Sequence, residues 1–418
     1  MMKILFVNTY DARTAPMNSI HLYCRDLKSI NVDCELLVQL KESDEPYVTD
    51  LGFKSHRVIS RKVQEMRHSL DDLPVKIYRH KNQTMFSPAW LPNKKLINRI
   101  NQSDADLVHL NWVAHGMLRI GDLAQIKKPV LWSLHDMMPI TGGCHYDNRC
   151  CRYETHCGNC PVLGSHTFHD LSYFCHERKI KTFAKMPNLI FNGVGKWITE
   201  CAKNSVTCKT NKISNVSCPI DTHAFRPLRK DIARDLLDLP CDKKIIAFGG
   251  DGMVNDPRKG YQNLKEALNL LPLNDVEILV FGSNNKSVEC KYPVHFTGHI
   301  NTLTGLRIVY SAADVVVMPS QQEVLGWIAA EAMSCGTPTV TFDIDGPKDD
   351  IVDHLETGYR ATPYDPKDLA NGLLWVLENE NYDQVSHLAR QRIIERFDSV
   401  KIAGEYKKLF SDILAGAF

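Results

Sequence analysis

The sequence contains no uninterrupted run of about 18 apolar residues, the length that a membrane-spanning helix needs. It also lacks low-complexity tracts and internal repeats with a period of about 20–50 residues, which argues against a repeat array. The first residues, MMKILFVNTYDARTAP, have an apolar core that is too short for a secretory signal peptide and is typical of a buried strand. We therefore expect a cytoplasmic protein.

Net charge is nearly absent as well, because 50 Lys and Arg residues balance 49 Asp and Glu residues to leave +1. This balance argues against a strongly basic nucleic-acid binder and against an acidic solvating protein. It conceals an asymmetry between the two halves of the chain. Residues 1–218 contain 29 basic and 20 acidic residues (net +9), whereas residues 219–418 contain 21 and 29 (net −8). Nucleic acid is not an expected partner, because no recognition motif accompanies the basic charge.

The length and the hydrophobic pattern predict the fold class. A single hydrophobic core stops growing at about 250–300 residues, so a chain of 418 residues predicts two domains. Short apolar runs alternate with helical patterns in both halves, which predicts α/β domains whose parallel sheets are covered on both faces. The expected strands are Lys3–Asn8, Glu35–Val38, Leu107–Leu110, Val130–Leu134, Leu189–Asn192, Lys244–Phe248, Glu277–Phe281, Val294–Thr297, Val315–Pro319 and Thr339–Phe342. The expected helices are Ile20–Ile30, Asn93–Ile100, Lys196–Asn204, Lys259–Leu270, Leu303–Ala312, Trp327–Ser334 and Pro366–Leu377.

The segment Ser214–Lys230 separates the two sets of elements. It has two prolines, few aliphatic residues and no clear period. We predict an N-terminal domain over residues 1–218, a C-terminal domain over 219–383 and C-terminal helices over 384–418 that pack back on the first domain. Because ligands of open α/β sheets bind at the carboxyl ends of the strands, we expect the site in a cleft between the domains.

The strand VVVMPS is followed by two glutamates at a helical spacing. Glu323 and Glu331 are eight residues apart, close to two helical turns, and Gly326 lies between them. If a helix begins at Leu325 or Gly326, its free N–H groups and positive dipole end can hold a phosphate. A carboxylate at Glu331 can then accept hydrogen bonds from a vicinal diol such as a ribose. Alternatively, both glutamates are solvated surface charges.

The stretch Ser320–Val340 resembles the E-x7-E region of the retaining glycosyltransferases of family 4, which have the GT-B fold. The resemblance continues over NDPRKGYQNLKEAL, FTGHI and YSAADVVVMPS upstream and over FDIDGPKDDIVDHLETGYRATPYDPKDLANGL downstream. In the first half, LVHLNWVAHGMLRIGDLAQIKKPVLWSLHDMMPITGGC resembles a subgroup that acts on bacterial surface polysaccharides of the colanic acid or O-antigen type. The resemblance implies two doubly wound, Rossmann-like domains that face an interdomain cleft.

The resemblance also implies which residues bind the donor. Arg258 and Lys259 match a basic pair that neutralises the donor diphosphate, a task that fixed cations can perform without a divalent metal. The backbone N–H groups of Leu325 and Gly326 would meet the phosphates. Glu331 matches the glutamate that holds the donor ribose.

The catalytic residues that the resemblance implies are Lys259, Glu323 and His135. Glu323 matches a glutamate placed near the transferred sugar. His135, in SLHD, matches a histidine that lines the cleft, where an imidazole can donate a hydrogen bond or assist proton transfer near neutral pH. Taken alone, His135 would be a core histidine bonded to a loop carbonyl. We expect Asp136 to orient the loop.

A cysteine-rich insertion over residues 142–163 contains GGCHYDNRCCRYETHCGNCP. Its C-x2-C knuckle and two upstream cysteines supply four thiolates, a set that suits a structural zinc. The pattern C-x5-C-x6-C-x2-C recurs in the subgroup that the chain resembles, and Cys144, Cys150, Cys157 and Cys160 match it. Such a zinc would pin the loop and shape the acceptor side. The alternatives are free thiols, disulfides formed on purification and an iron–sulfur cluster.

A dense basic stretch between Phe53 and Ile100 is interleaved with apolar residues. Basic charge with exposed aromatic groups suits docking on an anionic bilayer, here the inner face of the cytoplasmic membrane. The alternative is a solvated face with some core aromatics. The basic residues are Lys54, Arg57, Arg61, Lys62, Arg67, Lys76, Arg79, His80, Lys81, Lys94, Lys95 and Arg99, and the apolar ones are Met85, Phe86, Trp90 and Leu91.

We interpret the chain as a retaining, metal-independent hexosyltransferase that moves a sugar from a UDP- or GDP-sugar to a growing, lipid-linked bacterial surface polysaccharide. No protein nucleophile is evident, so the expected mechanism is front-face substitution in which the departing diphosphate takes the acceptor's proton. One alternative is a GT-B nucleotide-sugar hydrolase or epimerase. Another is a non-catalytic, zinc-stabilised scaffold of polysaccharide assembly, against which the presence of Lys259, Glu323 and Glu331 argues.

Overall fold

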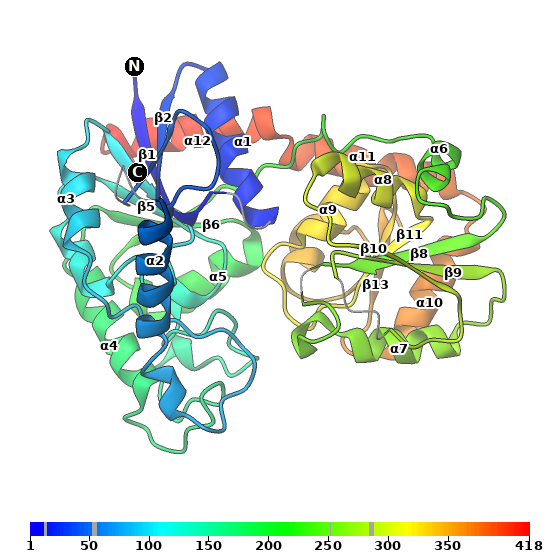
Figure 1. Ribbon diagram of the computed structural model, residues 1–418, viewed down its shortest axis with the longest axis horizontal. Coiled ribbons are helices and arrows are strands. Elements are labelled where there is room, and N and C mark those ends of the chain that lie inside the picture. Colours follow the sequence, from blue (N-terminus) through cyan, green and yellow to red (C-terminus); the bar gives the residue numbers. More distant parts are fainter. Residues whose placement is uncertain (12–14, 52–56, 251, 284–287) are drawn as a thin grey trace. The chain divides into compact units, whose positions relative to one another are not determined.

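The computed structural model describes residues 1–11, 15–51, 57–250, 252–283 and 288–418, so Phe53 and Lys54 of the basic stretch lie outside the described residues. The chain divides into two compact units (Figure 1). Unit 1 comprises Met1–Pro219 and Val400–Phe418, and unit 2 comprises Ile220–Ser399. No helix in the described part of the chain is both long and apolar enough to cross a membrane.

Unit 1 is built on a seven-stranded parallel sheet with the order β3-β2-β1-β4-β5-β6-β7. The strand order reverses between β1 and β4, which makes the carboxyl ends of these two strands the expected ligand-binding edge. The strands are β1 (Lys3–Tyr10), β2 (Asp33–Leu40), β3 (Val48–Asp50), β4 (Leu107–Leu110), β5 (Val130–Leu134), β6 (Leu189–Gly193) and β7 (Lys212–Asn215).

Helices cover both faces of this sheet, as adjacent residues of β5 demonstrate. The helices of unit 1 are α1 (Ala15–Ser29), α2 (Arg57–Asp71), α3 (Lys94–Gln102), α4 (Leu171–Phe183), α5 (Lys196–Asn204) and α12 (Ser399–Leu414), with short turns η1 (Val75–Ile77), η2 (Ile120–Gln125), η3 (Met138–Ile140), η4 (Arg152–Glu154) and η5 (Val206–Cys208). Leu131 packs in a buried cluster with residues of α1 and α12. Trp132 points to the opposite face, where its ring centroid lies 6.0 Å from that of Phe183 on α4.

Unit 2 is built on a six-stranded parallel sheet with the order β10-β9-β8-β11-β12-β13. Its strands are β8 (Lys244–Gly249), β9 (Val276–Phe281), β10 (Val294–Gly298), β11 (Val315–Met318), β12 (Thr339–Phe342) and β13 (Gly358–Ala361). Its helices are α6 (Lys230–Asp235), α7 (Tyr261–Leu270), α8 (Leu303–Ala312), α9 (Trp327–Ser334), α10 (Pro366–Leu377) and α11 (Tyr382–Phe397), with short turns η6 (Pro257–Lys259) and η7 (Pro347–Ile351). Every residue of β11 and β12 is buried, as expected for strands covered on both faces.

The last helix, α12, joins the core of unit 1 although it follows unit 2 in the chain. Tyr406 is buried, and its hydroxyl accepts a hydrogen bond from Asn192 Nδ2 (2.9 Å) and donates one to the carbonyl oxygen of Val216 (3.1 Å). Tyr23 of α1 donates to the same hydroxyl at 3.3 Å. The helix is therefore fixed to the sheet by polar as well as apolar contacts.

The predicted fold class is confirmed: the chain forms two Rossmann-like α/β units with parallel sheets of seven and six strands. Leu107–Leu110, Val130–Leu134 and Trp327–Ser334 have the bounds that the sequence predicts. The structure adds three edge strands, β3, β7 and β13, and the helices α2, α4 and α6, for which the sequence predicts nothing.

Candidate active site

In unit 2 the predicted cations lie between the carboxyl ends of β8 and β11. The turn η6 follows β8 and ends at Gly260, whose φ is 73°. A Cβ at Gly260 would lie 1.8 Å from the carbonyl oxygen of Pro319, so glycine alone allows this turn to pack against the residues after β11. Asp256 caps the turn by accepting a hydrogen bond from the N–H of Arg258 (2.9 Å).

Glu323 is the centre of an ion-pair cluster. Its Oε2 lies 3.1 Å from Lys259 Nζ and 3.6 Å from Arg258 Nη1. Arg258 also donates to Asp256 Oδ2 (3.2 Å) and to the carbonyl oxygen of Gln322 (3.0 Å). Burial by itself would raise the pKa of Glu323, but the charges of Lys259 and Arg258 outweigh it and hold this pKa below its usual value. The structure therefore brings three of the predicted site residues together as an ionised cluster.

The helix α9 begins just after this cluster. Gly326 precedes its first residue with a φ of 97°, and no side chain caps the helix in the described part of the chain. A Cβ at Gly326 would lie 3.0 Å from Met318 Cε and 3.1 Å from Pro347 Cγ, so both the backbone angle and the available space favour glycine. Leu325, just before it, is buried. The N-terminal N–H groups of α9 therefore follow Glu323 by a few residues, and a helix N-terminus favours an anion.

Glu331 lies on the second turn of α9. It is 5% exposed, and its Oε2 accepts a hydrogen bond from the hydroxyl of Tyr310 on α8 at 2.8 Å. Burial raises the pKa of Glu331 to about 7, although the hydrogen bond from Tyr310 opposes this shift. Near neutral pH its carboxyl can therefore exist with or without a proton.

His135 lies in unit 1, at the carboxyl end of β5. Its Nε2 lies 3.0 Å from Asn111 Oδ1, and its Nδ1 lies 3.7 Å from Cys218 Sγ. Because an amide oxygen only accepts hydrogen bonds, Nε2 carries the proton. Burial lowers the pKa of His135 to about 4, and the neighbouring charge of Asp136 offsets this only in part. A neutral ring near pH 7 suits hydrogen bonding better than proton donation.

Asp136 anchors the loop that follows β5. Its carboxylate accepts hydrogen bonds from Trp112 Nε1 (2.9 Å) and from the N–H of Met138 (2.8 Å), and it lies 2.7 Å from His145 Nδ1. Burial opposes ionisation, but His145 and these hydrogen bonds outweigh it and lower the pKa of Asp136. His145 Nε2 lies 2.8 Å from Ser87 Oγ. Both Trp112 and His145 lie within the quoted motifs, but the sequence assigns neither of them a role beside Asp136.

The cysteine-rich insertion does not form the predicted metal site. Among the described residues, no group of three or more His, Cys, Asp or Glu side chains is arranged to hold a metal ion. Cys144, Cys157 and Cys160 are buried free thiols, and Cys150 is partly exposed. Burial raises the pKa of Cys144 and of Cys157, which favours the protonated thiol. The prediction of a structural zinc at these four cysteines is therefore not supported.

Apolar packing and a buried lysine hold the insertion instead. Val75 and Phe86 pack in one buried cluster with four residues of the insertion, Cys144, Cys160, Val162 and Leu163. Lys179 of α4 is fully buried, and its Nζ donates hydrogen bonds to the carbonyl oxygens of Thr141 (2.9 Å) and Met138. Burial lowers the pKa of Lys179. These bonds connect α4 to the loop that carries the insertion.

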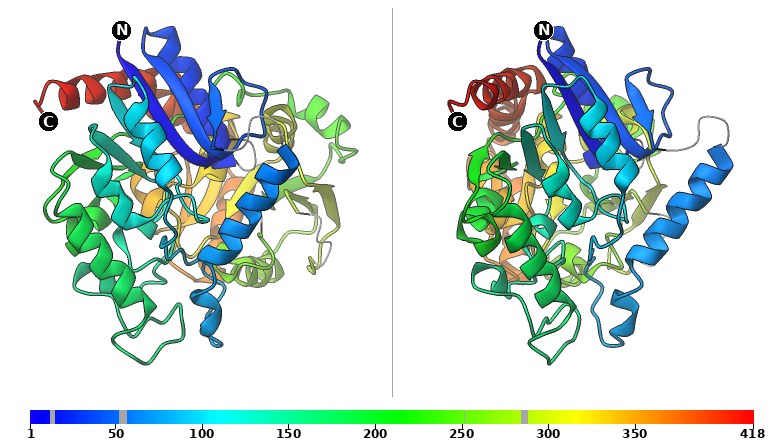
Figure 2. Two further views of the ribbon diagram at one scale, coloured as in Figure 1. Left: turned by 60° about the vertical axis from the view of Figure 1, so that its left-hand side comes forward. Right: turned by 90° about the vertical axis from the view of Figure 1, so that its left-hand side faces the viewer.

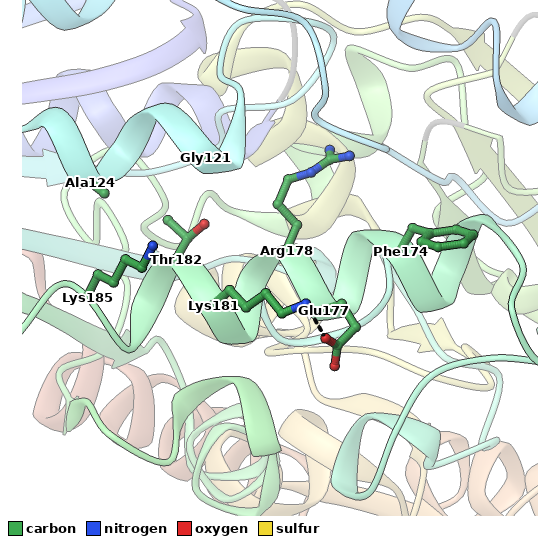
Figure 3. A pocket seen from close by; sticks show the side chains of 8 residues that line it. All are labelled: Gly121, Ala124, Phe174, Glu177, Arg178, Lys181, Thr182 and Lys185. Atoms are coloured by element: carbon green, nitrogen blue, oxygen red, sulfur yellow. Dashed lines mark ion pairs between the residues drawn. The ribbon is translucent and has the colours of Figure 1, made fainter.

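Unit 1 also has a basic pocket of about 460 Å³ between η2 and α4 (Figure 3). Its lining includes Arg178, Lys181, Lys185 and the ring of Phe174. Figure 3 shows Lys181 turned toward Glu177, with 2.9 Å between their charged atoms, whereas Arg178 extends away from α4. The Nη1 atom of Arg178 is buried and has no hydrogen-bond partner among the described residues. The pocket therefore favours an anion.

Residues 237–395 match the protein family described as glycosyl transferases group 1. That segment contains the Glu323 cluster and Glu331. The chain is 31% identical over 183 residues to D-inositol 3-phosphate glycosyltransferase of Mycolicibacterium smegmatis and 29% identical over 175 residues to an uncharacterized glycosyltransferase of Methanocaldococcus jannaschii. These matches cover 41% and 39% of this chain and 41% and 44% of the relatives, less than half of any of the proteins.

Solved structures resemble the chain over its whole length. Sucrose-phosphate synthase from Thermosynechococcus elongatus has a TM-score of 0.70 at 17% identity, and the match covers 100% of both chains. Anabaena HepE in complex with UDP-glucose has a TM-score of 0.63 at 14% identity, with 99% of this chain and 100% of that chain covered. Likeness at such identities shows the fold, which is that of the GT-B glycosyltransferases.

Proposed function

We propose that this protein is a retaining family 4 glycosyltransferase that takes a sugar from a UDP- or GDP-sugar without a catalytic metal. The observation that carries the proposal is the cluster of Lys259, Arg258 and Glu323 just before the N-terminus of α9. Fixed cations and helix N–H groups stabilise the negative charge of a departing diphosphate. The group 1 match over this segment, and the UDP-glucose bound to HepE, support a nucleotide-sugar donor.

Each residue of the cluster has a distinct part in donor binding. The diphosphate oxygens displace Glu323 from Lys259 and Arg258, which frees its carboxylate to accept hydrogen bonds from hydroxyls of the transferred sugar. The N–H groups of Leu325 and Gly326 meet the phosphates. Glu331 accepts hydrogen bonds from the ribose diol in place of the one from Tyr310.

The transfer breaks the bond between the anomeric carbon and the diphosphate oxygen, and the electron pair leaves with the diphosphate. The acceptor oxygen forms its bond on the same face of the anomeric carbon, so the configuration is retained. The acceptor's hydroxyl proton passes to the departing diphosphate oxygen. Lys259 and Arg258 stabilise the charge that develops there. His135, neutral near pH 7, donates a hydrogen bond from Nε2 to an acceptor or sugar oxygen instead of to Asn111.

The acceptor that we propose is a growing, lipid-linked bacterial surface polysaccharide. A nucleotide-sugar hydrolase or epimerase would use the same donor cluster without an acceptor. A non-catalytic scaffold would bind no donor.

A two-stage experiment distinguishes these functions. Thermal stabilisation by a panel of UDP- and GDP-sugars identifies the donor, and a ligand at 100 times its dissociation constant adds about 2.7 kcal/mol. Incubation of that donor with lipid-linked and free saccharides, followed by mass spectrometry, then detects transfer. Free sugar without an acceptor product would establish the hydrolase, an altered sugar the epimerase, and no donor binding at all would overturn the proposal.

We also propose that one end of unit 1 docks on an anionic membrane surface. The segments 73–85 and 160–174 pack together there, since Asn82 N donates to the carbonyl oxygen of Val162 (2.9 Å) and Leu171 N donates to the hydroxyl of Tyr78 (2.9 Å). Figures 1 and 2 show both segments at the same end of the unit, beyond α2. The docking surface comprises the exposed apolar residues Leu73, Ile77, Met85, Phe168 and Phe174 and the exposed basic residues Lys76, Arg79 and Lys81.

Exposed apolar side chains ringed by basic ones suit the interface of an anionic bilayer. Ile77 is 78% exposed and Phe174, at the rim of the basic pocket, is 54% exposed, so burial against protein does not account for either. Co-sedimentation with vesicles of phosphatidylglycerol, and with neutral phosphatidylcholine vesicles as control, tests this contact. We expect binding to the anionic vesicles that weakens in the double variant Ile77→Ser, Phe174→Ser. Equal binding of the wild-type protein to both vesicle types would contradict it.

A further inference from the structure

Four rings form a continuous row at the carboxyl edge of the sheet in unit 1. The ring of Trp112 lies 6.2 Å from that of Tyr10 and 4.8 Å from that of His115, measured between centroids. His115 stacks on His68 at 3.7 Å with 28° between their planes. All four side chains are half-buried, which leaves part of each ring accessible to solvent. The aromatic row is defined here as Tyr10, Trp112, His115 and His68.

The row comes from three separate segments that the sheet and α2 bring together. Tyr10 is the last residue of β1, and Trp112 follows the end of the neighbouring strand β4 by two residues. His68 lies on α2. The order of the strands reverses between β1 and β4, and ligands of open α/β sheets bind at such a switch point.

The backbone at His115 is held in an unfavourable conformation. Its φ is 53°, in the left-handed region that non-glycine residues rarely adopt. Two hydrogen bonds maintain it: its Nδ1 lies 2.9 Å from the hydroxyl of Tyr10, and its carbonyl oxygen accepts from Gln39 Nε2 at 3.2 Å. Such over-determined strain is concentrated at binding and catalytic sites. We take this strain as a sign that the fixed position of the His115 ring serves a binding site.

Hydrogen bonds to neighbouring residues of unit 1 also hold Trp112 in place. Its Nε1 donates to Asp136 Oδ2 (2.9 Å), and its backbone N–H donates to Asn8 Oδ1 (2.8 Å). The N–H of Thr9 donates to the carbonyl oxygen of Trp112 (2.8 Å). The indole therefore keeps its orientation before any ligand binds, which lowers the entropic cost of ordering this side chain on binding.

We propose that the aromatic row binds a pyranose ring of the acceptor saccharide, an inference that rests on the proposed function. A pyranose presents a face of C–H groups that packs on flat aromatic rings, while its hydroxyls bond to polar groups at the ring edges. Tyr10 and His115 supply such polar edges next to the indole of Trp112. His135 lies at the same edge of the sheet, directly after the neighbouring strand β5, and its partner Asn111 directly precedes Trp112.

The test uses the full-length protein and simple glycosides. Saturation-transfer NMR with methyl pyranosides of glucose, galactose, mannose and N-acetylglucosamine reports direct binding without a donor. His115→Gly removes a ring and allows the backbone angle at that position, and His68→Ala removes the ring that stacks on His115. His166→Ala, an exposed histidine elsewhere in unit 1, is the matched control.

With the wild-type protein we expect saturation transfer to the C–H groups of one pyranose face for at least one glycoside. This signal should be weaker in both row variants and unchanged in the control variant. With the identified acceptor, the row variants should raise the acceptor KM by about tenfold and leave kcat and donor stabilisation nearly unchanged. Equal saturation in all variants, no saturation with any glycoside, or an unchanged acceptor KM would overturn the inference. Failure of donor stabilisation in the wild-type protein would instead count against the proposed function, and the NMR result would stand by itself.

Discussion

Burial controls the protonation of Glu331. Its pKa of about 7 in the folded protein, against a usual value of 4.5, means that the folded chain keeps a proton that the unfolded chain releases in that range. The folded state is thus progressively disfavoured as pH rises from about 4.5 to about 7, and the penalty is constant above that.

The variant Glu331→Gln removes this titration while keeping the shape of the side chain. We expect the free energy of unfolding of the wild-type protein to fall relative to that of the variant by up to about 1.4 kcal/mol per pH unit across this window. Urea denaturation of both proteins between about pH 4.5 and pH 8 measures the difference. Parallel pH profiles would show that Glu331 is solvated or already ionised.

Lys259 offers a residue-scale test of the donor cluster. Its loss removes the closer of the two cations on Glu323 and, under the proposed function, one of the two cations that bind the diphosphate. We expect Lys259→Met to weaken donor binding by about tenfold to a hundredfold, since a hydrogen bond to a charged group contributes about 1.5–3 kcal/mol. Isothermal titration with the nucleotide-sugar that stabilises the wild-type protein measures this loss.

Lys265→Met is the matched control for that experiment. Lys265 lies six residues further along, on α7, and pairs with the exposed Glu289 at 3.0 Å. Its loss should leave donor affinity unchanged, because exposed ion pairs contribute little. Equal losses in Lys259→Met and Lys265→Met would point to a non-specific charge effect instead of a diphosphate site.

At the scale of elements, the sequence predicts the interior of each sheet better than its edges. β11 reads VVVM and is buried throughout, so its apolar run is unambiguous. The edge strand β7 reads KISN and buries only Ser214, so it carries no apolar pattern. The helix α2 carries Ile59, Val63, Met66 and Leu70 at a helical spacing, so the sequence does contain a helical signal there that the predicted helices leave out.

Some residues of the candidate site could be predicted from the sequence, and others are brought together only by the fold. The resemblance to family 4 groups Lys259 with Glu323 and Glu331, and the structure brings Lys259 Nζ to 3.1 Å from Glu323 Oε2. Trp112 and His115 meet the remaining two rings of the aromatic row only through strand pairing and the placement of α2, which no local pattern encodes. The cysteine spacing predicted a zinc that the structure does not support, because spacing alone does not determine how four side chains converge.

The helix α12 should matter for unit 1 in particular, because it fills one face of that sheet. Tyr406→Ala removes a fully buried ring and leaves Asn192 Nδ2 without the hydroxyl it donates to. We expect a loss of about 3–5 kcal/mol in the free energy of unfolding, by analogy with other aromatic-to-alanine changes. Tyr406→Phe keeps the packing and should lose only about 0.5–1.5 kcal/mol, the net contribution of a hydrogen bond, because Asn192 Nδ2 still donates to the carbonyl oxygen of Val216 at 2.8 Å.

Denaturant unfolding of both variants, followed by the near-ultraviolet circular dichroism of the aromatic side chains, measures these losses. A similar loss in the two variants would mean that the hydroxyl, and not the ring, holds the helix in place.

At the scale of the whole molecule, the charge asymmetry coincides with the division into units. Unit 1 contains 32 Lys and Arg and 22 Asp and Glu residues (net +10), whereas unit 2 contains 18 and 27 (net −9). Their sum is the +1 of the whole chain. The proposed donor is an anion that binds the acidic unit, so its affinity must come from the local cations Arg258 and Lys259 acting against the field of the surrounding carboxylates.

Salt should therefore affect the two proposed ligands differently. It screens the attraction of unit 1 for an anionic bilayer, whereas in unit 2 it screens both the local attraction and the long-range repulsion of the donor. Between about 0.05 and 0.5 M salt we expect binding to phosphatidylglycerol vesicles to fall by more than tenfold and donor affinity to change by less than about threefold. Vesicle co-sedimentation and donor titration over one salt series measure both quantities in the same protein. If vesicle binding and donor affinity fell equally steeply with salt, the difference in net charge between the units would be unrelated to where the donor and the membrane bind.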